Sequence, residues 1–421
     1  MASAVNTVES LNGLFKESYA DKIKDLVPEG VKLYNMIPFN SSQKQTGNLY
    51  HCPLALGLEH GFTYGGDEGV AFNLNDSIAS SNRDAQVKGF ELVLRSAISV
   101  GAASRSVTSK NAFEQATKRL VQNMLKSMHI RLEIQILYGQ VGIARIADIS
   151  GAPVIGICAS EWAPGIWAGA KNMAIEIRSQ AGTLRGTANV VNVDMKNKKL
   201  ELDALPVGVT ANADAENSAA DVIYCKGAYQ KEFAGLHKMI TNTGTIFNVD
   251  AAQYELYKGN IVEVGTDFSA GAAFISFEKI EEAITLSMEK GLMEEDVVAL
   301  VNPRHWQKLM TDLAAKRQYD DSYTEKEFKQ GAKSITFFGA NGRIEVVASL
   351  FVKEGYAYVF PPKELERIGS SDVTFEMPGF EGKFFRLMES QNGYELRVYT
   401  DQALFSSAIG QFSLLKYIKT A

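Results

Sequence analysis

The chain has 421 residues, of which 46% are apolar and 22% are charged. This apolar content is too high for a disordered chain, and a net charge of −6 without a long basic run argues against nucleic-acid binding through a broad basic surface. Three cysteines cannot build a disulfide framework, so we expect a reducing compartment. The length suits two or three domains with a core of ordinary size.

Targeting signals are not visible in the sequence. No run approaches the ~20 apolar residues that a membrane helix needs. Residues 1–10 lack the basic and apolar regions of a signal peptide. We therefore expect a protein that is made in a cytoplasm and has no membrane partner.

The first part of the chain, residues 1–40, has the pattern of an arm rather than a domain. Apolar residues recur at helical spacing over residues 11–27, which predicts a short helix. Pro28 and Pro38 break the segment after this helix. Such an arm has too little apolar surface to fold alone, so we expect a neighbouring chain to order it.

Two long strand candidates come next, at about Asn48–Tyr64 and Gln86–Ser104, with a polar stretch at Asp67–Asp84 between them. This pattern predicts a long two-stranded ribbon with a loose tip. About fifteen residues of strand reach ~50 Å. Because an isolated hairpin is marginal in water, the ribbon should lie on something, and a neighbouring subunit would serve. Two strands of an ordinary sheet are the alternative.

Charged residues of this ribbon are the candidate contacts between subunits. Those near the tip are Asp67, Glu68 and Arg83. We expect them to pair with charges of a neighbouring chain. Simple solvation is the alternative, because exposed ion pairs contribute only ~0–1 kcal/mol each.

The clearest helix is predicted over residues 112–138. An apolar row recurs at every fourth position from Ala116 to Ile136, and Asn111 with Glu114 fits a capping box. Gly139 fits the C′ position that ends a helix. The opposite face carries five basic side chains: Lys118, Arg119, Lys126, His129 and Arg131. We favour a solvated or subunit-facing surface over nucleic-acid contact, because no aromatic residues interleave with these charges.

The remainder of the sequence predicts an α+β fold with much antiparallel sheet. A small β-rich module is expected at 165–235, with a hairpin of strands 190–194 and 200–203, a loop at 208–220 and a strand at 221–224. Helices are predicted at 277–290, capped by Ser276, and from Asn302-Pro303 onward. Further strands are predicted at 334–338, 343–348, 356–360, 383–400 and 404–418.

Catalytic motifs of the familiar kinds are missing from the sequence, which has no phosphate-binding glycine loop, no zinc spacing and no nucleophile elbow. The best metal candidate is His51-Cys52 with His60. A buried reduced cysteine between polar ribbon residues is favoured instead, because no fourth ligand stands at a standard spacing. The paired carboxylates Asp67-Glu68 and Asp320-Asp321 fall in polar loops, where solvation explains them.

Aromatic residues and a histidine also have ordinary explanations. His305 beside Trp306, and the pair Trp162 and Trp167, are explained by packing more simply than by catalysis or ligand stacking. We therefore predict no catalytic residue, no metal and no cofactor. The sequence favours a protein whose product is its own assembly.

The order of segments resembles the major capsid protein of tailed bacteriophages, the Hong Kong 97-type fold. The local match with most weight is Val297–Trp306, where a strand runs into Asn-Pro-Arg-x-Trp at a helix start, similar to a segment in the axial domains of that family. Gly235-Leu236 with Gly244-Thr245 resembles the linker before that domain, and Gln411–Ile418 resembles its closing strand.

The resemblance implies seven segments. They are an N-terminal arm at 1–47, an extended β-hairpin loop at 48–105, a peripheral domain at 106–164 with spine helix 112–138, a small β-rich insertion at 165–235, an axial domain at 236–376, return strands of the peripheral domain at 377–402, and a C-terminal axial-domain strand at 403–421.

The resemblance also implies a function. The chain would self-assemble into the hexamers and pentamers of an icosahedral phage head, a virion capsid that is assembled in the host bacterial cytoplasm. It would enclose double-stranded DNA without sequence-specific binding, which suits a mild negative charge. Because little precedes the ribbon, a separate scaffolding protein or prior cleavage is implied. A portal is the other expected partner, and a cement protein is left open.

Two alternatives and one departure accompany this hypothesis. The chain could instead form an encapsulin-like nanocompartment shell around enzymes, or be a metal-dependent enzyme with a cryptic site at His51, Cys52 and His60. Some members of the family cross-link through a lysine of the extended loop. The ribbon's Lys88 lies near the second strand rather than the tip, so cross-linking is not predicted.

Overall fold

The computed structural model describes residues 30–40, 47–66, 71–101, 116–214, 216, 219–293, 295–311, 335–339, 342–376, 384–389 and 392–420. The chain divides into two compact units. One contains the described parts of 94–127 and 375–398, and the other those of 28–93, 128–374 and 399–421. The described elements mix helices with a larger share of sheet, so the predicted α+β class is confirmed. No helix among the described residues is long and apolar enough to span a membrane.

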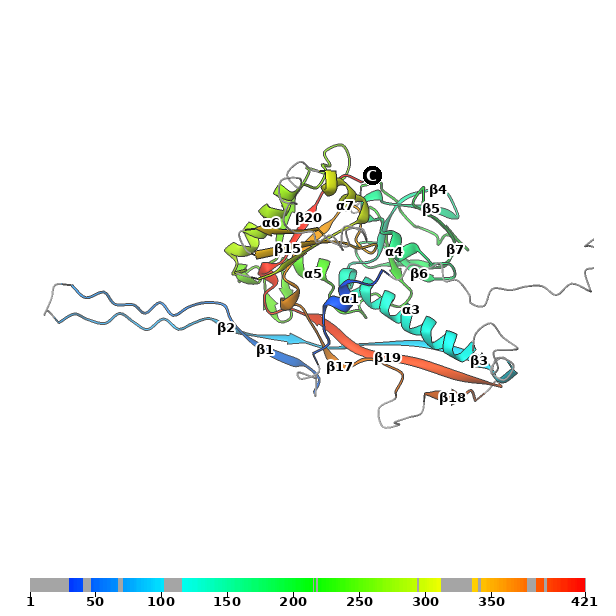
Figure 1. Cartoon of the computed structure of the whole chain (residues 1–421), viewed down its shortest axis with the longest axis horizontal. Helices are drawn as coiled ribbons and strands as arrows, with labels where there is room; N and C mark the ends of the chain where they lie inside the picture. Colours follow the sequence, from blue (N-terminus) through cyan, green and yellow to red (C-terminus); the bar gives the residue numbers. More distant parts are fainter. Residues whose placement is uncertain are drawn as a thin grey trace, which may run out of the picture. The chain divides into compact units, whose positions relative to one another are not determined.

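The larger unit contains a six-stranded sheet, of which β15 and β20 are labelled in Figure 1. Its strand order is β12 (Asn260–Glu263), β20 (Ser413–Lys416), β16 (Ala357–Phe360), β13 (Val297–Val301), β15 (Gly342–Ala348) and β14 (Ile335–Gly339). Every residue of β13 and β16 is buried. Unbroken apolar runs are typical of central strands that are covered on both faces.

Two helices, α6 (Phe277–Glu289) and α7 (Pro303–Thr311), cover one face of this sheet. Val297, Ala299 and Val301 of β13 share one core cluster with Ile280 of α6 and Leu309 of α7, as the two-residue period of a strand requires.

Both helices begin where the sequence predicts. The Ser276 hydroxyl accepts the backbone N–H of Lys279 (3.4 Å), and the Asn302 side-chain oxygen accepts the backbone N–H of Arg304 (3.1 Å). Such caps satisfy backbone N–H groups that have no partner within the helix.

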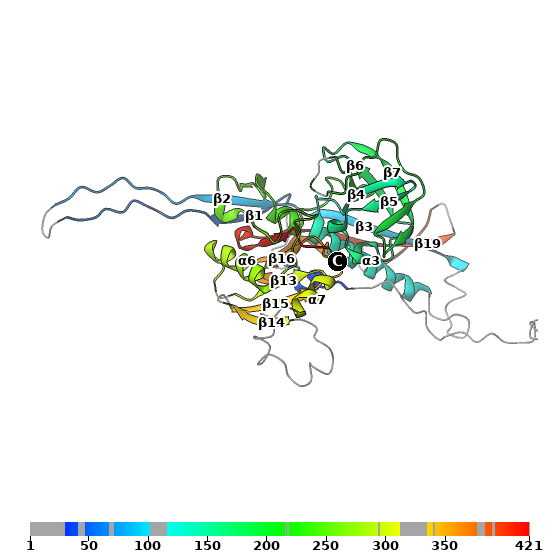
Figure 2. The same ribbon diagram turned by 90° about the horizontal axis from the view of Figure 1, so that it is seen from above.

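A closed β-barrel precedes this sheet in the chain (Figure 2). Its strands follow the order β4 (Ala144–Gly151), β5 (Val154–Ile157), β8 (Lys199–Leu202), β7 (Leu184–Asp194), β6 (Ala174–Arg178) and β9 (Val222–Cys225). The predicted hairpin and the strand after it are confirmed as β7, β8 and β9. The module begins at β4, however, and not at residue 165.

The early start of the barrel has a physical reason. β4 pairs with both β5 and β9, so the barrel cannot close without it. Its pairing with β5 shifts register twice, at Asp148 and before Gly151. These irregularities interrupt the alternation of apolar and polar residues by which a strand is recognised in a sequence.

A third sheet contains β19 (Gly393–Phe405), β3 (Phe90–Ser99), β17 (Glu366–Thr374) and β18 (Phe385–Leu387), with β19 paired to the other three. β19 is one strand, so the boundary expected between 402 and 403 falls inside an element. The remaining boundaries of the seven-segment division stay predictions.

The long helix α3 is described over Ala116–Tyr138, and Asn111 and Glu114 lie outside the described residues. The second part of its apolar row is confirmed, since Met124, Met128, Leu132 and Ile136 are buried, whereas Leu120 is half-buried. Gly139 was predicted to be the C′ residue that ends the helix, and this prediction is wrong by one position. The residue with a positive φ is Gln140 (68°), whereas Gly139 is a close approach: a Cβ there would lie 2.2 Å from the carbonyl oxygen of Phe233.

The predicted ribbon exists with shorter strands. β1 (Tyr50–Ala55) pairs antiparallel with β2 (Asn82–Val87). Beyond these strands the two segments of the ribbon continue side by side (Figures 1 and 2). They are joined by the hydrogen bonds from Leu56 N–H to Ser81 O (2.7 Å) and from His60 N–H to Ile78 O (3.2 Å).

The second ribbon strand predicted at 86–104 was wrong, because the chain leaves β1 after Val87 and β3 pairs with β19. Gly89 makes this change of partner possible. A Cβ at this position would lie 2.3 Å from the Asp401 carboxylate of β19, so only glycine fits without displacement.

Short elements complete the described chain. The helices are α1 (Leu33–Met36), α4 (Pro164–Trp167) and α5 (Leu236–Ile240), the strands are β10 (Thr245–Ile246) and β11 (Val249–Asp250), and the 3₁₀ turns are Ala159–Glu161, Glu255–Tyr257, Pro362–Glu364 and Ile409–Gln411.

Candidate functional site

The ribbon beyond β1 and β2 exposes large apolar side chains. Tyr64 is 88% and Leu74 is 81% exposed. The full set is Leu58, Phe62, Tyr64, Phe72, Leu74 and Ile78. A soluble protein rarely leaves such side chains clustered in water, and clusters of this kind mark interaction surfaces. We call these six residues the apolar ribbon.

Local hydrogen bonds, rather than a core, hold the apolar ribbon together. The Asn75 side-chain amide donates to the Phe62 carbonyl (2.8 Å), and the Asn75 backbone N–H donates to the Thr63 hydroxyl (2.8 Å). Gly61 lets the other segment of the ribbon approach closely, because a Cβ at this position would lie 3.2 Å from the Asp76 carbonyl oxygen. These contacts join the two segments of the ribbon without covering its apolar side chains.

The base of the ribbon is fixed to the body of the larger unit. Arg83 of β2 donates from Nε to the Tyr254 hydroxyl (2.7 Å), and its guanidinium lies 5.4 Å from the centre of that ring. The Gln86 N–H donates to the Phe247 carbonyl (2.9 Å), and the Asn248 side chain donates to the Asp84 carbonyl (3.2 Å). The β10–β11 region thus anchors the strands from which the ribbon extends.

The three candidate contact residues are not brought together by the described structure. Asp67 and Glu68 lie outside the described residues. Arg83 lies opposite Leu54 at the base of the ribbon and not near its tip, and it contacts Tyr254 of the same chain. Pairing of these charges with a neighbouring chain stays a prediction.

The candidate metal ligands have other partners. His51 Nδ1 lies 2.6 Å from an Asp84 carboxylate oxygen, and hydrogen bonds from Gln86 and His51 lower the pKa of Asp84. Burial raises the pKa of the Cys52 thiol, which favours the protonated form over the thiolate that binds metals. No three His, Cys, Asp or Glu side chains within the described ranges gather closely enough to hold a metal ion.

The end of the N-terminal arm is pinned to α3 by a buried carboxylate. Glu133 accepts the backbone N–H groups of Lys32 (3.2 Å), Leu33 (3.0 Å) and Tyr34 (2.6 Å) at the start of α1. Burial raises the pKa of Glu133, while these hydrogen bonds oppose the rise. No local sequence pattern indicates this contact, because the partners are far apart in the chain.

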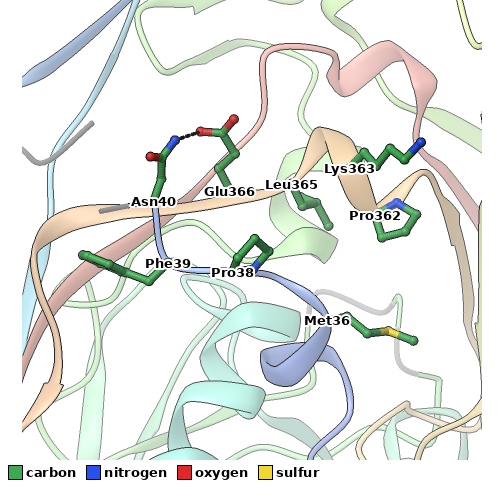
Figure 3. A pocket seen from close by; sticks show the side chains of 8 residues that line it. All are labelled: Met36, Pro38, Phe39, Asn40, Pro362, Lys363, Leu365 and Glu366. Atoms are coloured by element: carbon green, nitrogen blue, oxygen red, sulfur yellow. Dashed lines mark hydrogen bonds between the residues drawn. The ribbon is translucent and has the colours of Figure 1, made fainter. Parts of the chain in front are cut away.

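Arg367 of β17 holds the same segment from the other side. Its Nε donates to the Ile37 carbonyl (2.8 Å), and its guanidinium lies 4.1 Å from the centre of the Tyr34 ring. The Asn40 side chain then donates to Glu366 (2.9 Å), as Figure 3 shows. Residues 37–40 therefore lie along β17, beside a cavity of about 530 Å³ that Met36, Pro38 and Leu365 line in part.

A buried ionic cluster joins the barrel to the six-stranded sheet. Glu161 lies 2.5 Å from Arg145 Nη1 and 3.2 Å from Lys353 Nζ, and the lysine also lies 4.4 Å from the centre of the Tyr138 ring. Burial alone would raise the pKa of Glu161, but the two cations hold it below its usual value. Each cation of the cluster therefore has a carboxylate oxygen of Glu161 as its partner.

Histidine and tryptophan side chains near these elements are packed, as predicted. His305 is 1% exposed and its Nε2 contacts the Glu354 carbonyl. Trp162 and Trp167 are fully buried, with stacked rings whose centres lie 6.1 Å apart.

Comparison with solved structures identifies similar folds over nearly the whole chain. A protein of the cyanophage A-1(L) capsid superposes with a TM-score of 0.56 at 9% identity, covering 98% of this chain and 99% of that one. The capsid of a native GTA particle gives 0.53 at 8% identity, covering 99% and 100%. The capsid of cyanophage P-SCSP1u gives 0.51 at 11% identity, covering 99% and 96%.

The chain has the fold of these capsid proteins. The predicted resemblance is therefore confirmed at the level of the fold. No protein-family model matches the chain, and no curated protein matches it in sequence. Identities near one residue in ten explain why the sequence carries only short local matches to the family.

Proposed function

We propose that this chain is a shell subunit that self-assembles into the hexamers and pentamers of an icosahedral phage head. The observation that carries the proposal is the full-length similarity to capsid structures, since 98% of this chain and 99% of the cyanophage A-1(L) protein superpose. The apolar ribbon also supports the proposal. Clustered exposed apolar side chains mark an interaction surface, and in a homo-oligomer a second copy of the chain can cover them.

Under this proposal the elements take the roles of a Hong Kong 97-type subunit. β1, β2 and the apolar ribbon form the extended loop, α3 is the spine helix, and the six-stranded sheet with α6 and α7 is the axial domain. The sheet of β3, β17, β18 and β19 belongs to the peripheral domain, and the barrel is an addition between the two in the chain.

Charged residues of the ribbon would take part in the contact between neighbouring subunits. Asp67 and Glu68 would pair with basic side chains of the neighbouring subunit, and Arg83 would fix the base from which the loop reaches across. Each exposed pair would contribute only ~0–1 kcal/mol, so the apolar side chains would supply most of the attraction.

The proposed contents and partners follow from the same role. The shell would enclose double-stranded DNA without sequence-specific binding, as a net charge of −6 permits, and would work with a scaffolding protein and a portal. The subunit would be assembled in the host bacterial cytoplasm, would become part of the virion capsid, and would have no catalytic role.

Sedimentation velocity of the purified full chain tests the proposal. We expect a species many times heavier than one 46.1 kDa subunit under conditions that permit assembly. A single boundary at the monomer mass, unchanged by protein concentration and salt, would contradict it. In particles recovered from the host, nuclease-protected DNA supports a phage head, whereas a protein cargo without DNA supports a nanocompartment.

A further inference from the structure

A cavity of about 570 Å³ lies away from the ribbon and the arm, between the barrel and the six-stranded sheet. Arg145 of β4, Lys238 of α5, Leu414 of β20 and Tyr356 line it together. A cavity of this size can take a small organic molecule. Its lining combines polar groups with apolar ones, and the polar groups determine which molecule fits.

One buried hydrogen-bond donor of a cavity-lining residue has no acceptor among the described residues. Arg145 Nε is buried and unpartnered, although Nη1 of the same side chain binds Glu161. Tyr356, which is 6% exposed, lines the same cavity. The Lys238 ammonium makes no ion pair with a described residue. Buried donors without acceptors are costly, so a ligand that accepts hydrogen bonds would remove that cost.

The charges around the cavity favour a single negative charge. Charged side chains that line it, or that belong to the same groups of ion pairs, comprise four cations and three carboxylates among the described residues: Arg145, Lys238, Lys353 and Lys416, with Glu161, Glu216 and Glu263. Burial lowers the pKa of His237 to about 3, so its ring is neutral at pH 7. One positive charge therefore remains unbalanced.

Part of the cavity lining is apolar. Val141, Ile261 and Leu414 line the same cavity, and Ile261 is 44% exposed at the sheet edge. A ligand that matches both the polar and the apolar lining residues has a carboxylate and an apolar body. We propose that this cavity binds a monocarboxylate, with Arg145, Lys238 and Tyr356 donating to the carboxylate and Ile261 contacting its apolar part.

The carboxylate could be a free small molecule or could be supplied by another copy of this chain, and one titration distinguishes the two sources. Benzoate is the probe, measured by saturation-transfer NMR on unassembled subunits and on closed shells. Binding to both identifies a free ligand. Binding to subunits alone identifies a carboxylate that a second copy supplies on assembly. No binding to either overturns the proposal.

Two matched comparisons make the result specific to the carboxylate. Benzamide has the same ring without the charge and should bind at least about tenfold more weakly than benzoate. Lys238→Gln and Tyr356→Phe should each weaken benzoate binding about tenfold, whereas Lys231→Gln, an exposed lysine outside the cavity, should not change it. Equal affinities for the two ligands, or no loss in either cavity variant, would contradict the site.

The titration on unassembled subunits is independent of shell formation. If the chain never closes into shells but binds benzoate as described, the proposed function fails and the cavity site remains. If shells form and benzoate does not bind, the reverse holds.

Discussion

At the scale of single residues, the cluster around Glu161 shows how charge is kept inside the protein. Glu161 is 3% and Lys353 is 2% exposed, and Arg145 completes the group. Removing charges from water costs several kcal/mol for each ion, which the mutual attraction must offset. Such a cluster adds little stability compared with an apolar core of the same volume. Removal of one of its charged side chains, however, leaves the others buried without a partner and destabilises the fold.

Replacement of this carboxylate is therefore expected to be costly. Glu161→Gln should lower the free energy of unfolding by about 3–5 kcal/mol, because Arg145 and Lys353 stay buried without a counter-charge. Urea unfolding followed by circular dichroism measures the change. The matched control is Glu281→Gln, an exposed carboxylate on α6, which should stay within about 0.5 kcal/mol of the parent chain.

A double variant separates charge from packing in this cluster. Glu161→Gln combined with Lys353→Met should lose less stability than the two single changes added together, because the second change removes a charge that the first leaves unpaired. Strict additivity, or a single Glu161→Gln variant as stable as Glu281→Gln, would show that the cluster does not act as described.

At the scale of elements, the apolar ribbon is the part that assembly would use. Leu58→Ser, Phe62→Ser and Leu74→Ser in one chain should leave the melting temperature of the unassembled subunit nearly unchanged, because all three side chains are already in water. The same variant should fail to form closed shells, measured as the loss of the fast-sedimenting species. Its apolar contact with a neighbour would be gone.

Exposed apolar residues elsewhere provide the control for the ribbon variant. Val207 is 95% and Met293 is 72% exposed, and neither belongs to the ribbon. Val207→Ser with Met293→Ser should assemble like the parent chain. Normal shells from the triple ribbon variant would rule out the ribbon as an essential contact.

Elements with strong local signals could be predicted from the sequence. The apolar run Val297–Val301, the capping Ser276 and the Asn302-Pro303 helix start each depend on neighbouring residues, and each is observed where it was expected. Elements defined by partners distant in the chain could not. The pairing of β3 with β19 and the closing role of β4 depend on strands far away in sequence, which no local pattern reveals.

The candidate site divides in the same way. The ribbon was foreseeable because its apolar and polar residues are close in sequence, although its strands are shorter than expected. The arm anchor at Glu133 and the ion pair of Glu161 with Lys353 were not foreseeable, since each joins residues from separate elements. A donor without an acceptor, such as Arg145 Nε, can be recognised only when its surroundings are known.

At the scale of the whole molecule, the chain shares its fold with capsid proteins over nearly its full length, and the shell role is our proposal from that fold. The net charge of −6 and the three cysteines are compatible with the proposed shell role in a reducing compartment.

Electron microscopy of the purified full chain probes this capsid role more directly than any other experiment. A capsid subunit should produce closed shells of uniform size with icosahedral symmetry, built from rings of five and six subunits. Fields that contain only particles of the size expected for one 46.1 kDa chain, under every condition that favours assembly, would contradict the capsid role.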